Sequence, residues 1–496
     1  MLDNVHDLAL CALAFCLAYI IPLILYRLYF HPLAHIPAPP LAKFTYLFEW
    51  YYDLALSGQL AFRLKTLHQK YGPVIRINPD TVHIADPEYF DELFNQTNGR
   101  NVKTTRIAEA FGPYPNVLGT ASHEPHRLRR SALNSFFSKK AVNDLLPAML
   151  RPINILCKRL EDASESNETL NMKYIFAAVT LDIINDYCFA RESACTLQPD
   201  FGRKGFENID NFLKLSLVNV HIPWLMRFTY ALPDRINKIL APTLAETLDF
   251  RRTIRRGLDN AHKHADHRTV FHELLTSKLP PQELARDRLR DEAFGLVTAG
   301  SGTTAIVLRN TTYHIAANES IRQKLQTELC TAIPDASAPL SLAHLEQLPY
   351  LLAVVNEGLR LCAPVTHRLT RQFPDRTLTC NNYTIPAGCS VSVTLPLILE
   401  NESIFPEPRA FRPDRWIGQE KHLEKYLIPF SRGPRACLGL NLARAEIVLI
   451  LAAVFRDFTF DVSAVVRERD VDTTRDLILA QTAPDSPGLL VKVRKC

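Results

Sequence analysis

The feature that most constrains the fold is the segment FSRGPRACLG, which begins at Phe430. The apolar run LNLARAEIVLILAAVF follows it and has the pattern of a buried helix. Cys437 therefore stands at a helix start, where the helix dipole favours a thiolate over a thiol. Gly433 and Gly439 permit tight turns beside a flat ligand, and Arg435 offers a partner for an anion. A buried, inert cysteine is the alternative for an isolated residue, but fixed residue types at this spacing indicate a built site.

The pattern F-x-x-G-x-R-x-C-x-G resembles the haem-binding loop of the cytochrome P450 family at every fixed position. The resemblance implies that Cys437 is the axial ligand of the iron in haem b, which is iron protoporphyrin IX. It also implies that Phe430 shields the sulfur, that Arg435 pairs with a haem propionate, and that Gly433 and Gly439 shape the haem-binding loop.

Two further segments carry the same resemblance. EGLR places Glu357 and Arg360 on one helical face, where they can pair, although E-x-x-R alone commonly marks a solvated salt bridge. FRPDRW supplies Arg415, which in the family completes a buried structural network with that glutamate and arginine. A buried charge needs its partners, so we expect the loss of one member to destabilise the others.

Candidates for the haem propionates lie elsewhere in the chain. HRLRRSALNSFFSK resembles the family's third helix, in which Arg130 matches the propionate-binding arginine. His126 stands where the family usually has tryptophan. Arg371, which follows Arg360 by eleven residues, is a third candidate.

The segment TAGSGTTA interrupts a predicted long helix from Arg286 to Ala317 with two helix-weakening glycines. Gly300, Gly302 and Ala305 satisfy the dinucleotide pattern G-x-G-x-x-A. That pattern must follow a strand and open a helix, whereas the preceding RDRLRDEAFGLV has charges at helical spacing. A Rossmann dehydrogenase is therefore the weakest alternative.

The same segment resembles the family's oxygen-binding helix, A-G-x-(D/E)-T-T. The resemblance implies that small residues open a groove for O2 and that Thr303, followed by Thr304, is catalytic and helps to deliver protons. Gly302 departs from the pattern because the family normally has an acid there. Positioned acids contribute about 10²- to 10⁴-fold to rate, so we expect water or substrate to replace it.

The N-terminus predicts a membrane anchor over residues 1–30. The 18 residues from Leu8 to Leu25 carry no charge, and the apolar span to Phe30 reaches about 34 Å as a helix. The alternatives are a buried core helix and a cleaved signal peptide. A signal peptide would have a basic start, whereas this chain begins with acidic residues. Arg27 and Lys43 after the span place the body in the cytosol. We therefore expect a single-pass protein of the endoplasmic reticulum membrane.

The rest of the chain predicts a mainly α fold with a minor β region, which the resemblance identifies as the cytochrome P450 fold. HPLAHIPAPP predicts an extended proline-rich hinge over residues 31–45, followed by a single domain over 46–496. The helices that the pattern predicts are Leu60–Tyr71, Pro87–Asn95, Lys139–Ala163, Met172–Phe189, Arg235–His264, Tyr350–Leu361 and Leu438–Phe458. Hairpins are expected within Val74–Ala85 and after Thr377, and two weak strand runs within Asp476–Val493.

Composition excludes several classes of protein. The net charge of +5 over 496 residues is small and does not indicate a nucleic-acid partner. The 11 cysteines are scattered without C-x-x-C, so neither a zinc site nor a disulfide framework is indicated. Most of them are expected to be thiols in a reducing compartment.

The resemblance covers nearly the whole chain and includes membrane-bound fungal members, such as the trichodiene-oxygenase type. It implies a haem-thiolate monooxygenase that takes electrons from an NADPH-cytochrome reductase and oxidises a lipophilic small molecule, such as a terpenoid or another secondary metabolite. A haem-thiolate isomerase or dehydratase that works without a reductase is the alternative, and a haem sensor or carrier is another. The expected reductase-docking residues are Arg129, Lys139, Lys140 and Arg432, and the expected pocket walls are Val365–Arg368, Phe111–Leu118 and Leu296–Ala299.

Overall fold

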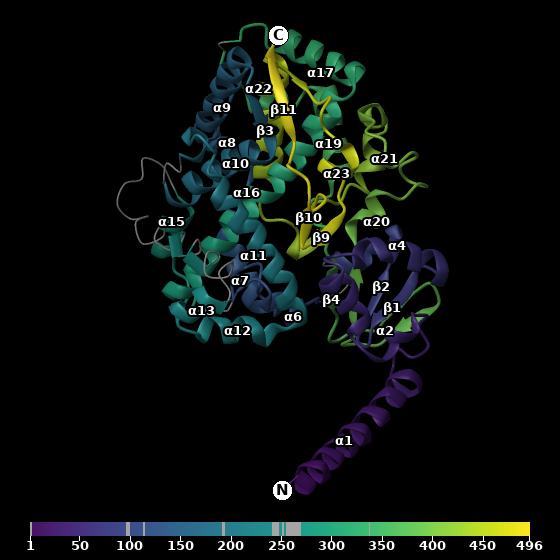
Figure 1. Cartoon of the computed structure of the whole chain (residues 1–496). Coiled ribbons are helices and arrows are strands. Elements are labelled where there is room, and N and C mark those ends of the chain that lie inside the picture. Colours follow the sequence, from purple (N-terminus) through teal and green to yellow (C-terminus); the bar gives the residue numbers. More distant parts are fainter. Residues whose placement is uncertain are drawn as a thin grey trace. The chain divides into compact units, whose positions relative to one another are not determined.

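The computed structural model describes residues 2–95, 100–112, 115–190, 194–240, 248–249, 252–253, 269–336 and 338–496. The chain forms two compact units, whose elements are labelled in Figure 1. The first comprises Met1–Thr104 and Arg368–Thr394, and the second Thr105–His367 and Leu395–Cys496. Helices dominate and the strands are short, which confirms the predicted fold class. The single domain over residues 46–496 stays a prediction.

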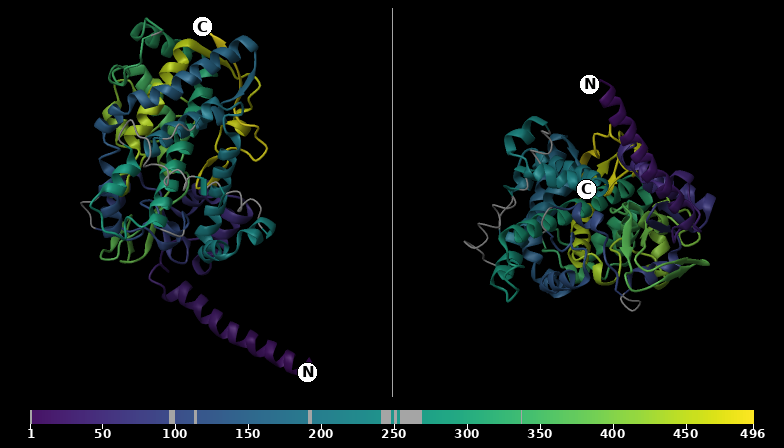
Figure 2. Two further views of the ribbon diagram at one scale, coloured as in Figure 1. Left: turned by 90° about the vertical axis from the view of Figure 1, so that its left-hand side faces the viewer. Right: turned by 90° about the horizontal axis from the view of Figure 1, so that it is seen from below.

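The first unit begins with α1 (Leu2–Leu25), which continues into the π-helical turn η1 (Tyr26–Phe30). Both views in Figure 2 show α1 as one uninterrupted rod. The window Leu13–Phe30 has a mean hydropathy of 1.9, and none of it is buried. By length and composition this helix can cross a membrane.

The proline-rich stretch after this helix is less extended than predicted. Pro40 occupies the first turn of a short helix, α2 (Pro40–Phe44), where its missing N–H costs nothing. Leu33 and Ile36 are fully buried. Apolar contacts therefore fix a segment that proline content alone predicts to be extended.

The remainder of the first unit surrounds a four-stranded sheet with the order β1-β2-β7-β4. Its strands are β1 (Val74–Asn78), β2 (Thr81–Ile84), β7 (Ser390–Val393) and β4 (Leu369–Gln372). The β1–β2 hairpin is confirmed, as is the second hairpin of β5 (Leu378–Cys380) and β6 (Tyr383–Ile385). Strands β4 and β7 were not predicted; β7 runs parallel to β2, a pairing with no local turn signal. The other elements are α3 (Leu47–Trp50), η2 (Tyr51–Ala55), α4 (Leu60–Tyr71), η3 (Pro87–Tyr89) and α5 (Phe90–Phe94).

The second unit is a helical assembly around α16 (Arg286–Ala316), the long helix that the sequence predicts. Helix α10 (Met172–Phe189) packs along it and is buried on nearly every side, because the sequence MKYIFAAVTLDII has little polar surface. The other longer helices are α7 (His123–Asn134), α8 (Lys139–Asp144), α9 (Leu146–Ser166), α11 (Arg203–His221), α12 (Pro223–Ala231), α17 (Glu319–Ala332), α19 (Pro349–Cys362) and α22 (Leu440–Asp457). The shorter helices are α6 (Thr105–Glu109), η5 (Cys195–Leu197), α13 (Asp234–Leu240), α15 (Val270–Thr276), α18 (Leu342–Leu345), α20 (Leu395–Leu399), η6 (Pro413–Trp416), α21 (Glu420–Glu424), η7 (Gly433–Arg435) and α23 (Arg467–Asp470).

Two small sheets complete this unit. Strand β11 (Leu490–Lys495) lies between β3 (Thr169–Asn171) and β8 (Phe458–Asp461), beside α9 (Figure 1). Strands β9 (Arg475–Leu477) and β10 (Leu479–Gln481) form a separate hairpin. Ile478 makes the turn between them at a φ of 72°.

Several predicted boundaries differ from the structure. The helix predicted over Lys139–Ala163 is divided at Leu145, and the one predicted to end at Phe458 ends one residue earlier, where β8 begins. Of the helix predicted over Arg235–His264, only α13 and two short stretches are described; the rest lies outside the described residues, as do 113–114 of a predicted pocket wall.

Candidate functional site

The cysteine loop is held by its own backbone. Gly433 has a φ of 72°, which lets the short helix η7 begin, and Ala436 N–H donates to Gly433 O at 3.0 Å. The N–H of Cys437 donates to Phe430 O at 2.8 Å. Helix α22 then begins, with Gly439 as its N-cap residue. The loop thus presents Cys437 just before a helix N-terminus, as predicted.

The thiol of Cys437 is accessible while it is surrounded by protein. Cys437 is an exposed residue. Burial by the surrounding atoms raises the pKa of its thiol, whereas the N–H of Gly439 and the positive charge of Arg130 lower it. A Cβ placed on Gly439 would meet no atom within 4 Å. Open space at Gly439 and the positive charge of Arg130 near the thiol together suit a liganded thiolate.

Two arginines beside this loop are desolvated. Arg435 donates to the carbonyl oxygens of Thr120 at 2.7 Å and Ala121 at 2.6 Å, and burial lowers its pKa to about 10. Arg130, on α7, donates to Ala436 O at 2.7 Å, and burial lowers its pKa too. Neither guanidinium contacts a carboxylate within the described part of the chain. A pair of desolvated cations without a carboxylate suits an anionic ligand.

The other predicted propionate residues divide between the units. His126 is buried on α7, the helix that carries Arg130. Arg371 lies in the first unit on β4, where Nη1 donates to Thr370 O and the guanidinium stands 4.9 Å from the Phe94 ring centroid. The roles of both toward a propionate stay predictions.

Glu357, Arg360 and Arg415 form the network that their spacing predicts. Arg360 is fully buried and donates to both carboxylate oxygens of Glu357, at 2.9 and 2.8 Å. Arg415 Nε donates to Glu357 Oε1 at 3.2 Å. Trp416 Nε1 donates to the other oxygen at 2.9 Å, a contact that the sequence did not single out. Every charge of this cluster is therefore paired.

The two adjacent threonines of α16 have different environments. The hydroxyl of Thr303 donates to Ala299 O at 3.0 Å, and the side chain is only partly buried. Thr304 is 3% exposed and hydrogen-bonds to Glu446 of α22. Burial raises the pKa of Glu446 well above its usual range. Glu446 was missed in the sequence, although a single carboxylate inside LNLARAEIVLILAAVF is the signal that identifies it.

Gly300 and Gly302 of α16 also have different environments. A Cβ on Gly300 would lie 2.9 Å from Cγ1 of Ile184, so this glycine permits the close contact of α16 with α10. A Cβ on Gly302 would meet only Leu479 Cδ1, at 3.7 Å. Space for a side chain therefore exists at Gly302, where the family pattern expects an acid.

The loop after α19 and the β9–β10 hairpin form one wall beside Gly302. Ala480 N–H donates to Pro364 O at 2.9 Å, and Val365 bridges to Leu479. Val365 and His367 were predicted as wall residues from the sequence. Asp476 was not, because it lies more than a hundred residues away from its partner His367.

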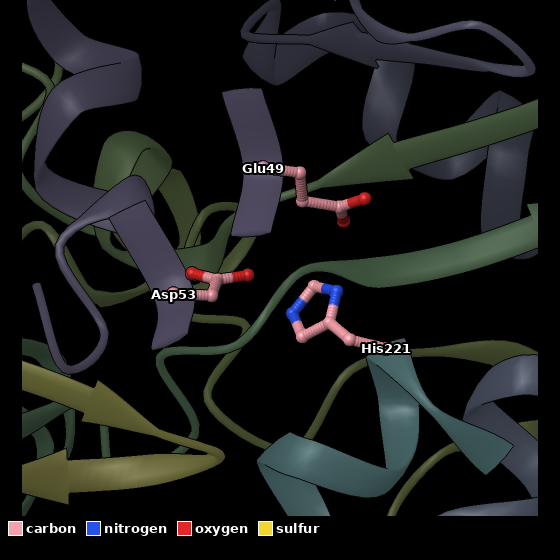
Figure 3. Close-up of side chains that lie close together, drawn as sticks. All are labelled: Glu49, Asp53 and His221. Atoms are coloured by element: carbon pink, nitrogen blue, oxygen red, sulfur yellow. The ribbon is translucent and has the colours of Figure 1, made fainter. Parts of the chain in front are cut away.

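Arg368, the last residue of that predicted wall, belongs to the first unit. Its Nη2 donates to Glu49 at 2.8 Å and to Asp53 at 2.7 Å. Figure 3 shows these two carboxylates, which come from successive turns of the α3–η2 segment. His221, also drawn in Figure 3, is the last residue of α11 in the second unit. Arg368 therefore has a structural ion-pair role within its own unit.

Comparison with known proteins decides the family. The model of the family "Cytochrome P450" matches residues 37–487. The chain belongs to the cytochrome P450 family. It is 38% identical to cytochrome P450 monooxygenase tpcC of Cochliobolus heterostrophus, over 96% of this chain and 95% of that protein. It is 35% identical to tryptophan 6-hydroxylase fscE of Fusarium equiseti, over 95% and 94%. It is 34% identical to N-acetyltryptophan 6-hydroxylase ivoC of Emericella nidulans, over 97% and 96%.

This protein is thus a cytochrome P450 monooxygenase, an oxidoreductase that incorporates one oxygen atom. The residues present fit haem: an accessible thiol at a helix start, open space at Gly439, and desolvated arginines for two propionates. Cys437 would hold the iron, and Arg130 and Arg435 would bind the propionates. When bound, haem supplies the oxygen-activating chemistry.

The expected reductase-docking residues are not equally available on the cytochrome P450 surface. Arg129 is largely buried and donates to both oxygens of Glu283, at 2.7 and 2.9 Å, so it does not form an exposed basic face. Lys139 is exposed but pairs with Glu346 at 2.7 Å. Arg432 donates to the carbonyl oxygen of Lys425. The docking face stays a prediction for the residues other than Arg129.

Proposed function

We propose that this cytochrome P450 monooxygenase inserts one atom of O2 into a lipophilic secondary metabolite, with electrons from an NADPH-dependent reductase. The observation that carries the proposal is the accessible Cys437 thiol beside two desolvated arginines that lack carboxylate partners. The test is the carbon monoxide difference spectrum of the reduced protein, comparing wild type with Cys437→Ser. We expect the red-shifted thiolate band in wild type and its loss in the variant. A wild-type protein without that band would overturn the proposal.

The relatives suggest the first substrates to test. Two of them are named as 6-hydroxylases of tryptophan or N-acetyltryptophan, and these names support testing an indole as substrate. Purified protein with reductase and NADPH should convert at least one apolar aromatic or terpenoid compound in a panel that includes these two amino acids. Product formation that does not require NADPH and reductase would instead support the isomerase or dehydratase alternative, which the missing acid at Gly302 favours.

Proton delivery in this protein runs through Thr303 and ordered water, since Gly302 supplies no acid. Thr303→Ala should lower the fraction of oxidised NADPH that yields product. Thr304→Ala is the matched control, because Thr304 is buried against Glu446 and should affect stability more than coupling. Equal coupling in Thr303→Ala and wild type would exclude this route.

Helix α1 anchors the protein in the endoplasmic reticulum membrane, with the catalytic part in the cytosol. The support is the exposed apolar helix and the basic residues that follow it. Deleting residues 2–25 should move the protein from the alkali-resistant membrane fraction to the soluble fraction. A full-length protein that alkaline carbonate extracts from membranes would contradict the anchor.

A further inference from the structure

His367 is a buried polar residue that the haem site does not use. It is 5% exposed, and its Nδ1 lies 2.9 Å from Oδ2 of the fully buried Asp476. Its other ring nitrogen, Nε2, is buried without a hydrogen-bond partner among the described residues. An unpartnered polar atom in the interior is destabilising, so this nitrogen is a candidate for contact with a ligand.

The hydrogen bonds around Asp476 indicate which ring nitrogen of His367 carries the proton. Oδ1 of Asp476 accepts from the hydroxyl of Thr366 at 2.9 Å and from the N–H of Ile478 at 3.1 Å. A carboxylate surrounded by donors acts as an acceptor, so Nδ1 of His367 carries a proton and donates to Oδ2. In the tautomer with its one proton on Nδ1, Nε2 holds a lone pair and accepts a hydrogen bond.

The loop that carries His367 adjoins the part of α16 that carries Gly302 and Thr303. His367 is two residues from Val365, which bridges to Leu479. Leu479 in turn is the side chain that approaches the open position at Gly302, next to Thr303. The loop, the β9–β10 hairpin and this part of α16 therefore adjoin one another within the second unit.

We propose that Nε2 of His367, oriented by Asp476, accepts a hydrogen bond from an N–H or O–H group of the substrate. The substrate class is accordingly an apolar molecule with one such donor, as in an indole, a phenol or an alcohol. The proposal rests on the proposed function for the identity of the site, and it adds a chemical requirement for the substrate. Asp476 is a positioning residue, since it acts only by fixing the imidazole tautomer.

The test uses haem-loaded full-length protein and two pairs of probes, indole with 1-methylindole and phenol with anisole. Within each pair, methylation removes the donor and leaves the aromatic body. Equilibrium dialysis without electron donors measures the affinity ratio of each pair in wild type and variants. His367→Phe should lower the donor-to-methylated affinity ratio by about three- to tenfold, the effect of one hydrogen bond. Comparing ratios cancels the different hydrophobicities of the probes and any general loss of packing.

Further variants distinguish the effect of the His367 tautomer from a general effect on the folded structure. His367→Gln retains an acceptor oxygen and should restore part of the discrimination. Asp476→Asn lets the amide donate to Nδ1, which moves the proton to Nε2, so the preference for donors should vanish or reverse. Thr366→Val removes a bond to Asp476 but leaves the tautomer, and its ratio should equal that of wild type.

Failure of the inference is distinct from failure of the proposed function. If no donor probe binds, or if His367→Phe has the wild-type ratios, the inference is wrong even in a protein that shows the thiolate band. If the band is missing while the ratios behave as described, the monooxygenase proposal fails and the hydrogen-bonding role stands. Circular dichroism and haem content confirm that each variant is folded before dialysis.

Discussion

At the scale of single residues, the carboxylate of Glu357 in the second unit accepts from four different residues. It accepts from Arg360, Arg415 and Trp416, and also from the backbone N–H of Arg412 at 2.9 Å. Its side chain and that of Arg360 are completely buried. Such a cluster is stable only while each charge retains its partner, because the interior provides no water to replace it.

We predict that Glu357→Gln destabilises the folded protein by about 3–5 kcal/mol, since it leaves two buried arginines without a countercharge. Asp414→Asn is the matched control. Asp414 neighbours Arg415 but pairs with Lys324 at the surface, so its loss should change stability by less than about 1 kcal/mol. Urea unfolding followed by circular dichroism measures both, and equal losses would contradict the prediction.

At the scale of elements, α16 is fixed by close contacts that only glycine permits. Gly300 allows the approach of Ile184 from α10, and Gly358 of α19 allows the approach of Thr311, whose Oγ1 would lie 2.2 Å from an added Cβ. Two neighbouring helices are therefore held against α16 through glycines. Gly300 therefore serves packing, while a side chain at Gly302 would make only an ordinary van der Waals contact with Leu479.

We predict opposite effects for alanine at Gly300 and at Gly302 of α16. Gly300→Ala should destabilise the protein by about 1–3 kcal/mol, because its methyl group overlaps Ile184. Gly302→Ala should stabilise it by up to about 1 kcal/mol through helix propensity, since its nearest neighbour lies at 3.7 Å. Thermal and chemical unfolding of the two variants test this. A stabilising Gly300→Ala would show that α10 and α16 are not tightly apposed.

At the scale of the whole molecule, buried titratable groups make stability depend on pH. His314 stacks on Phe411, with ring centroids 5.0 Å apart. Burial first, and then the charges of Arg467 and Arg360, lower its pKa to about 3. The unfolded residue binds a proton below about pH 6.5, but the folded one stays neutral until much lower pH. The unfolded state is therefore favoured as pH falls between these values.

We predict that His314 contributes a loss of about 2 kcal/mol of stability between pH 6.5 and pH 5. The comparison is wild type with His314→Phe, which retains an aromatic ring beside Phe411 but cannot bind a proton. The difference between their unfolding free energies should change across this range, with wild type losing more on acidification. Parallel pH profiles would show that His314 does not remain neutral in the folded protein.

Local sequence determined much of this protein. The cysteine loop, the Glu357–Arg360 spacing, the hairpins β1–β2 and β5–β6, and helices such as α4 and α10 follow from residues close together in the chain. Turns and helical periodicity depend on residues close together in the sequence, so these features are predictable from it. The motifs also indicated the family, which the comparisons confirmed.

Only the tertiary structure determined which residues far apart in the sequence come into contact. Strand β7 pairs with β2 across the sequence, Thr304 is buried against Glu446 while Thr303 is not, and His367 meets Asp476. Gly300 also permits the close approach of Ile184, a contact that the pattern does not predict. No local pattern encodes these contacts, because each depends on which helix faces and strand edges become neighbours once the apolar surfaces are buried.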